Sequence, residues 1–197
     1  MCVNTNFSTE PRVTRELLHK GSKFDFERLT FSGNAGASIT RECIRHPGSV
    51  IIAPIWHPPG GEPHLILIEN WRLSNEQWMI ELPAGTRTPG EDPALCAARE
   101  LTEETGFIAG HLEPLCSFHT APGLTDELMH AFVATSLTPA AQHLEDDERI
   151  RVLPTPLREV PFLLTSGKVT DAKTLLLLHL LDRRPPDWLR APSSAPV

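Results

Sequence analysis

The sequence predicts a mixed α/β fold that is not built as a series of βαβ units. Alternating apolar and polar residues between 22 and 45 predict antiparallel strands, because a period of two is typical of a half-buried strand. Apolar runs at 50–55 and 65–68, the second followed by Glu69, predict two buried strands at 50–55 and 65–69. A well-delimited helix is expected at 93–105, and a leucine-rich helix is expected to begin near Asp171.

The remaining elements follow from the same patterns. Further strands are expected at 78–82, 112–118, 128–136 and 149–153. These elements predict a small N-terminal β-subdomain at 22–47 and a main domain at 48–182. The two termini, 1–21 and 183–197, are expected to be loose. Because the strands of the subdomain would otherwise form a small and poorly buried sheet, we expect them to make the contacts of a homodimer.

Composition and charge exclude several classes of protein. The 197 residues carry a formal net charge of −7, and no run of Lys and Arg could follow a phosphate backbone, so no nucleic-acid partner is expected. The longest apolar run, at 175–181, is far too short to cross a bilayer, so no membrane partner is expected. The scattered cysteines (Cys2, Cys43, Cys96 and Cys116) fit reduced thiols and a cytoplasmic protein.

The helix at 93–105 has clear end signals. Asp92 suits the N-cap and Pro93 suits the first helical position, because the first N–H groups of a helix need a side-chain acceptor or are absent in proline. Gly106 suits the position directly after the last helical residue, since glycine readily adopts the left-handed conformation that ends helices.

Three carboxylates lie in the C-terminal half of this helix. Glu100 and Glu104 are four residues apart and share a face, and Glu103 lies on its flank. Like charges at this spacing repel, and the helix dipole disfavours anions near the C-terminus. The alternative is a solvated acidic face. A metal site is favoured instead by four residues at fixed spacings along the sequence, before, within and after the helix: Gly85, Glu91, Arg99 and Gly106. Arg99 is expected to pair with Glu103 and to reach back to Glu91.

The ligand chemistry narrows the metal. Oxygen ligands alone select Mg²⁺, Mn²⁺ or Ca²⁺ over zinc. Mg²⁺ keeps part of its water shell and favours substrate phosphates as further ligands. The sequence therefore predicts chemistry at a phosphate or diphosphate, with Mg²⁺ as the cofactor and Mn²⁺ as a substitute.

The stretch 85–107 resembles the signature of the Nudix hydrolase family, and several outer features resemble its ADP-ribose pyrophosphatase branch. Pro122 follows Phe107 by fifteen residues, the spacing of a marker proline in that branch. The segments 70–72, 81–85 and 167–174 also resemble the corresponding parts of its members.

The resemblance implies a fold, a metal site and a substrate site. The fold would be an α/β/α sandwich around a mixed sheet, preceded by the small β-subdomain. The implied metal ligands are Glu100 and Glu104, with Glu103 and the carbonyl of Ala84. The implied substrate-binding residues are Arg72, which would bind the diphosphate, together with Glu81, Gly123 and Glu127.

The resemblance also implies the reaction, an attack by water on one phosphorus with no covalent enzyme intermediate. Metal ions would activate the water, and a general base would lie on a loop after the marker proline. That loop is expected at 142–149, where Glu145 and Glu148 are the candidates. The alternative for either residue is an ordinary solvated acid.

The implied activity is hydrolysis of ADP-ribose or a related nucleoside diphosphate sugar to a nucleoside monophosphate and a sugar phosphate. Alternative substrates for the same reaction are GDP-mannose, ADP-glucose, dinucleoside polyphosphates and (d)NTPs. An alternative without catalysis is a regulator that binds ADP-ribose. Tyrosine is absent, so a ring that stacks on the base would be Phe or Trp. Phe24, Phe26 and Phe31 are candidates, although burial in a core is the commoner fate of phenylalanine.

Overall fold

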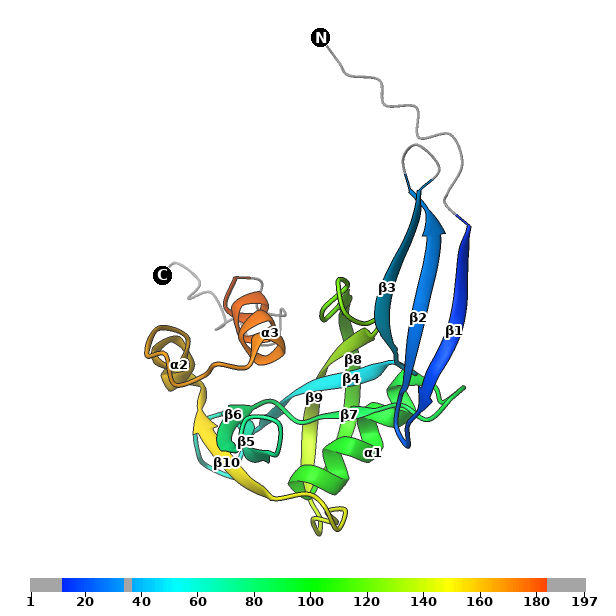
Figure 1. Cartoon of the computed structure of the whole chain (residues 1–197). Coiled ribbons are helices and arrows are strands. Elements are labelled where there is room, and N and C mark those ends of the chain that lie inside the picture. The colour runs from blue at the N-terminus through cyan, green and yellow to red at the C-terminus, as the bar shows by residue number, and fades with distance from the viewer. Residues whose placement is uncertain (1–11, 34–36, 184–197) are drawn as a thin grey trace. The chain divides into compact units, whose positions relative to one another are not determined.

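The computed structural model of the chain describes residues 12–33 and 37–183 (Figure 1). It separates into two compact units. One comprises the chain up to Gly48 together with His119–Leu128, and the other comprises Ser49–Phe118 together with the chain from Met129 onward. Most of the two termini that we expected to be loose, at 1–11 and 184–197, lies outside the described residues.

The first unit contains the N-terminal sheet. Its strands β1 (Val13–Lys20), β2 (Asp25–Ser32) and β3 (Ser38–Arg45) pair antiparallel in the order β1-β2-β3. The prediction of an antiparallel N-terminal sheet is confirmed.

Strand β1 corrects the prediction that residues 1–21 form a loose arm. All eight of its residues are exposed, so it has no buried face to impose an apolar–polar alternation. Backbone pairing with β2 and three cross-strand ion pairs hold it instead. In these, Arg15 lies 2.9 Å from Glu27, Arg28 lies 3.0 Å from Glu16, and Lys20 lies 2.8 Å from Asp25.

The segment His119–Leu128 joins this unit from far along the chain. The Ile44 N–H donates to the Leu124 carbonyl (2.9 Å), and Arg45 forms an ion pair with Asp126. The patterns along the sequence did not predict this association, because it depends on single hydrogen bonds between segments distant in the chain.

The second unit is built on a seven-stranded mixed sheet. Five of its strands follow the order β10-β5-β4-β9-β8, while β6 pairs with β5 and β7 pairs with β4. Strand β4 runs parallel to β9 and antiparallel to β5 and β7. The bounds are β4 Ser49–Trp56, β5 His64–Arg72, β6 Gln77–Glu81, β7 Ala84–Thr86, β8 Phe107–His119, β9 Leu128–Pro139 and β10 Ile150–Pro156.

The helices of this unit are α1, α2 and α3, with a short 3₁₀ turn before α2. Their bounds are α1 Pro93–Thr105, the 3₁₀ turn Leu157–Glu159, α2 Val160–Thr165 and α3 Ala172–Arg183. Helices α1 and α3 match the predicted ones. The six-residue α2 was not predicted, because it is too short to show helical periodicity.

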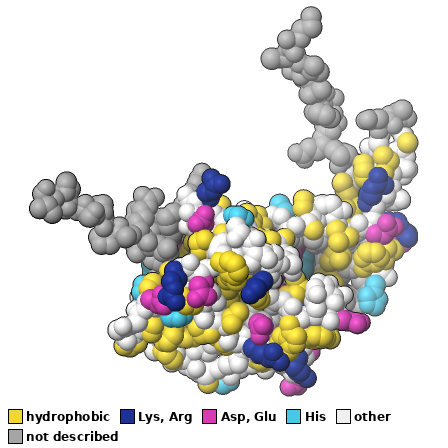
Figure 2. All heavy atoms as spheres, turned by 90° about the vertical axis from the view of Figure 1, so that its left-hand side faces the viewer, with side chains coloured by type: hydrophobic (Ala, Val, Ile, Leu, Met, Phe, Trp, Pro, Cys, Tyr) yellow, Lys and Arg dark blue, Asp and Glu magenta, His cyan; other side chains and the backbone are white. Residues whose placement is uncertain are grey.

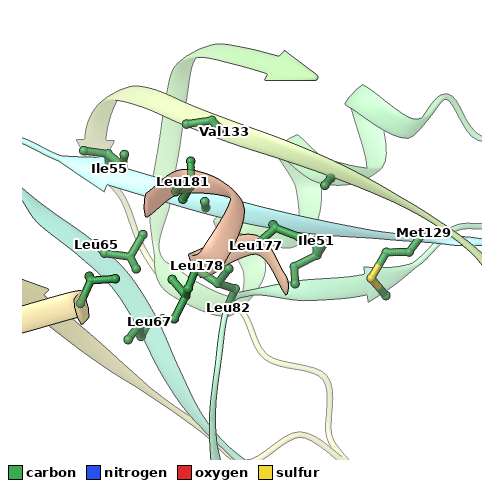
Figure 3. Close-up of a cluster of buried hydrophobic side chains, with 13 residues drawn as sticks. Ile51, Ile55, Leu65, Leu67, Leu82, Met129, Val133, Leu177, Leu178 and Leu181 are labelled. Carbon is green, nitrogen blue, oxygen red and sulfur yellow. The ribbon is translucent and has the colours of Figure 1, made fainter. Parts of the chain in front are cut away.

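Helices α1 and α3 cover opposite faces of the sheet, since successive residues of β4 point in opposite directions. Ile51 and Ile55 belong to the cluster that contains Leu177 and Leu178 of α3 (Figure 3). Ile52 belongs to a second cluster, with Cys96, Ala97 and Leu101 of α1. The predicted α/β/α sandwich is confirmed.

On the face seen in Figure 2, Lys and Arg side chains lie beside Asp and Glu side chains among hydrophobic ones, and the described residues form no continuous basic patch there. None of the described helices has the length and apolar character needed to cross a bilayer.

Candidate active site

Helix α1 turns two carboxylates toward the inside of the protein. Asp92 caps it by accepting hydrogen bonds from the Ala94 and Leu95 N–H groups, and Gly106 ends it in the left-handed conformation, at φ 68°. Between these caps, Glu100 is 7% exposed and Glu104 is 3% exposed. Two buried acids on one face would be costly unless their charge is compensated.

Strand β7 passes close to these carboxylates. The Ala84 N–H donates to Oε2 of Glu104 (2.9 Å). At the next residue, Gly85, a Cβ would overlap the carboxylate of Glu100. The glycine is therefore required for the close approach of the strand to the acid, a reason that spacing along the sequence did not reveal.

Arg99 connects the helix to the preceding loop. Its guanidinium contacts Glu91 (3.2 Å) and Glu103 (2.9 Å), the two partners expected from the sequence. It also contacts Glu100 (2.8 Å). Arg99 thus compensates part of the negative charge of the acidic helix and holds the loop that carries Glu91.

Burial changes the acidity of the two helix acids. Burial raises the pKa of Glu100 to about 7 and raises the pKa of Glu104 well above its ordinary value. The charge of Glu148 is among the causes in both cases, so the loop that carries Glu148 lies near the helix acids. Burial therefore destabilises the ionised form of each carboxylate, and a nearby cation would stabilise that form.

The donor set fits a hard divalent ion, because it consists of carboxylate oxygens. Among residues 12–33 and 37–183, however, no three His, Cys, Asp or Glu side chains are already gathered as a metal site. The structure brings Glu100 and Glu104 together, with Glu103 on the flank held by Arg99. Metal binding would then draw further oxygen ligands from substrate and water.

The acidic loop folds into a tight turn. Oε2 of Glu148 accepts a hydrogen bond from the Glu145 N–H (2.9 Å), and the Glu148 N–H donates to the Glu145 carbonyl (3.0 Å). The two predicted candidates for the general base therefore sit at opposite ends of one turn.

A buried ion network lies where β5, β6 and α3 meet. Glu81, at 1% exposure, accepts two hydrogen bonds from Arg72 (2.7 and 2.5 Å) and one from Lys173 (2.7 Å). Lys173 also contacts Asp171 (2.8 Å). Both oxygens of Glu81 are thus engaged by cations of the protein, while the Arg72 side chain remains 38% exposed.

Lys173 was missed by the sequence reasoning, although a signal was present. It lies in the first turn of α3, where the helix dipole disfavours a cation. The same argument, applied to anions at the other end of a helix, had singled out Glu100 and Glu104.

The other predicted substrate residues belong to the first unit. Around Gly123 the space is open, with no atom within 4 Å of a Cβ placed there. Glu127 accepts a hydrogen bond from the Thr120 hydroxyl (2.5 Å) and lies 3.8 Å from Nε2 of His46. Phe24, a candidate for base stacking, is 49% exposed and stacks on His46 rather than lying in a core.

The contact between Arg99 and Glu91 predicts a pH dependence of stability. The hydrogen bond from Arg99 lowers the pKa of Glu91 from 4.5 to about 2. A carboxyl whose pKa is lower in the folded state stabilises the fold above the ordinary pKa, and this contribution is lost as the pH falls toward the folded value. Glu91→Gln should therefore lower the Tm of the metal-free protein at neutral pH, and the gap to wild type should narrow below about pH 4.5. A pH-independent gap in thermal melts would contradict this role.

The chain is similar to several known proteins. Residues 45–178 match the model of the NUDIX domain. The chain is 32% identical over 174 residues to the ADP-ribose pyrophosphatase of Bacillus subtilis (strain 168), covering 87% of this chain and 92% of that protein. It is 28% identical over 184 residues to a GDP-mannose pyrophosphatase of Escherichia coli, covering 91% and 90%. A crystal structure of an ADP compounds hydrolase superposes with a TM-score of 0.75 at 25% identity, covering 89% and 94%.

Proposed function

The chain belongs to the NUDIX family of hydrolases, and we propose that it is a Mg²⁺-dependent pyrophosphohydrolase of ADP-ribose or a related nucleoside diphosphate sugar. The products would be a nucleoside monophosphate and a sugar phosphate. The observation that carries this proposal is the pair of buried carboxylates on α1, Glu100 and Glu104, whose pKa values are raised by burial.

Four residues would hold the cation. Glu100 and Glu104 would be its main ligands, with Glu103 and the carbonyl of Ala84 as further ligands. Mn²⁺ is expected to substitute for Mg²⁺, because both prefer oxygen ligands. When bound, such a cation neutralises diphosphate charge and lowers the pKa of a coordinated water.

Glu148 would act as the general base. A base must lie within hydrogen-bond reach of the attacking water and outside the ligand set. Glu148 lies near enough for its charge to raise the pKa of both helix acids. It would take the proton of a water whose oxygen attacks one phosphorus, as the bond from that phosphorus to the bridging oxygen breaks. Glu145, at the other end of the turn, is the second candidate.

Arg72 would bind the diphosphate. Two of its nitrogens donate to Glu81, which leaves the remaining N–H groups of the guanidinium for a ligand. Glu81 is itself inaccessible, so it would act on substrate through Arg72 by fixing the plane of the guanidinium. Gly123 and Glu127 belong to the first unit and stay predictions from the family resemblance.

The names of two relatives point to different nucleoside diphosphate sugars, ADP-ribose and GDP-mannose. We expect kcat/KM to be highest for ADP-ribose, because the relative with the higher identity and the solved structure both act on adenine nucleotides by name. The test is a panel of ADP-ribose, GDP-mannose, ADP-glucose, diadenosine polyphosphates and dNTPs at equal enzyme and Mg²⁺. A clear preference for GDP-mannose would overturn the choice of base, and binding of ADP-ribose without turnover would indicate a regulator.

We also propose that the protein is a cytoplasmic homodimer. Large apolar side chains of the N-terminal sheet are exposed, among them Val13, Leu17 and Phe26, and a second copy would bury them. Cys43, Cys96 and Cys116 are free thiols, as a reducing compartment favours. Light scattering should give twice the mass of the chain, and a monomer at micromolar concentration would exclude the dimer.

A further inference from the structure

A distant segment of the chain caps the C-terminal end of α1. The last carbonyls of a helix have no partner within it. Here the Ala140 N–H donates to the carbonyl of Gly106 (2.6 Å), and the His143 N–H donates to the carbonyl of Glu103 (3.0 Å). The side-chain amide of Gln142 donates to the carbonyl of Glu104 (2.6 Å). Two of these bonds come from the backbone, so Gln142 supplies the one that a substitution can remove.

The close fit of this segment requires a glycine at the helix end. A Cβ on Gly106 would lie 2.9 Å from the carbonyl oxygen of Ala140 and 3.1 Å from the Gln142 nitrogen. Gly106 therefore both ends α1 and leaves room for the segment 140–143 to lie against it.

The same segment leads directly into the acidic turn, which is anchored again at its far end. The Trp71 N–H donates to the Arg149 carbonyl (3.0 Å), and Ile150 begins the pairing of β10 with β5. The turn of Glu145 and Glu148 thus lies between two fixed points. One of these points is the end of the helix that carries Glu100 and Glu104.

We propose that Gln142 is a positioning residue for the general base. Its amide fixes the segment 140–143 on α1, and this sets where Glu148 stands relative to Glu100 and Glu104. The role deepens the proposed function and rests on it, because it matters for turnover only if Glu148 takes a proton during hydrolysis. The proposal assigns Gln142 no direct contact with substrate or metal.

The test compares three variants of the full chain with wild type. Gln142→Met keeps the length of the side chain but removes the donor. Gln142→Lys keeps a donor, and its cation suits a helix C-terminus. Asp92→Ala is the matched control, because it removes a cap from the opposite end of the same helix without touching the acidic loop. Each is measured by steady-state hydrolysis of ADP-ribose and by amide hydrogen exchange without metal.

We expect Gln142→Met to lower kcat about tenfold with KM within about twofold of wild type, as the loss of one hydrogen bond that orients a catalytic group predicts. Amide exchange should rise across residues 140–148. Gln142→Lys should recover most of both properties, and Asp92→Ala should lower the Tm while leaving kcat and the exchange of 140–148 unchanged.

Two results would overturn the proposal. One is wild-type kcat and unchanged exchange in Gln142→Met, and the other is an equal defect in the Met and Lys variants, which would exclude the donor as the cause. If wild-type protein hydrolyses no member of the substrate panel, the proposed function fails. The exchange data then decide separately whether Gln142 fixes the segment.

Discussion

Replacing Glu104 with glutamine is expected to abolish hydrolysis of ADP-ribose while leaving the protein folded. The carboxylate is 3% exposed, and burial raises its pKa well above the ordinary value. Glutamine has nearly the same shape, and its carbonyl oxygen can still accept the hydrogen bond from the Ala84 N–H. The substitution thus removes the charge and little else.

We expect kcat/KM of Glu104→Gln to fall by at least about 100-fold, because even the partners of metal ligands are worth about 10–100-fold in affinity or activity. Without metal, the Tm should be equal to or higher than that of wild type, since a buried acid that is costly to ionise has been neutralised. Glu159→Gln is the matched control, because Glu159 is an exposed glutamate of the same unit. Wild-type turnover in Glu104→Gln would refute the assignment of the metal site.

Gly85→Ala is expected to cause a loss of similar size through a different route. A Cβ at this position would occupy the place of the Glu100 carboxylate. That carboxylate is the end of a flexible side chain, so it can move aside and the fold should survive. A displacement of about 1 Å in a catalytic group costs on the order of 100-fold in rate.

A double-mutant cycle separates this route from general damage. If Gly85→Ala acts by displacing Glu100, then Gly85→Ala, Glu100→Gln and the double variant should lose similar amounts of kcat/KM. Losses that add would show that the alanine harms the enzyme elsewhere. The same variants should melt within a few degrees of wild type, which thermal denaturation followed by circular dichroism can check.

The parts of the fold that local chemistry determines could be predicted from the sequence. Helix α1 begins and ends where the cap signals of Asp92, Pro93 and Gly106 predict. Most of β4 and the stretch Leu65–Ile68 of β5 are apolar, because both faces of the strands are buried there. In each case the residues that specify the element lie within it or next to it.

Features that depend on tertiary contacts could not be predicted in this way. The reason for Gly85 is a carboxylate fifteen residues further along the chain, and the cap by Gln142 comes from thirty-eight residues after Glu104. The strand β1 carries no alternation because it has no buried face. For the candidate site, the spacing of residues along the sequence identified the acids of α1. The residues that hold Arg72 and those that anchor the acidic turn became visible only in the fold.

The central claim is that the acids of α1 support metal-dependent cleavage of a nucleotide sugar. The most direct measurement is product analysis of ADP-ribose incubated with purified wild-type protein, with Mg²⁺ and with EDTA. We predict AMP and ribose 5-phosphate in equal amounts with Mg²⁺, and neither product with EDTA. Equal release of AMP with Mg²⁺ and with EDTA, or no cleavage of ADP-ribose or any other nucleoside diphosphate sugar with Mg²⁺ or Mn²⁺, would contradict it.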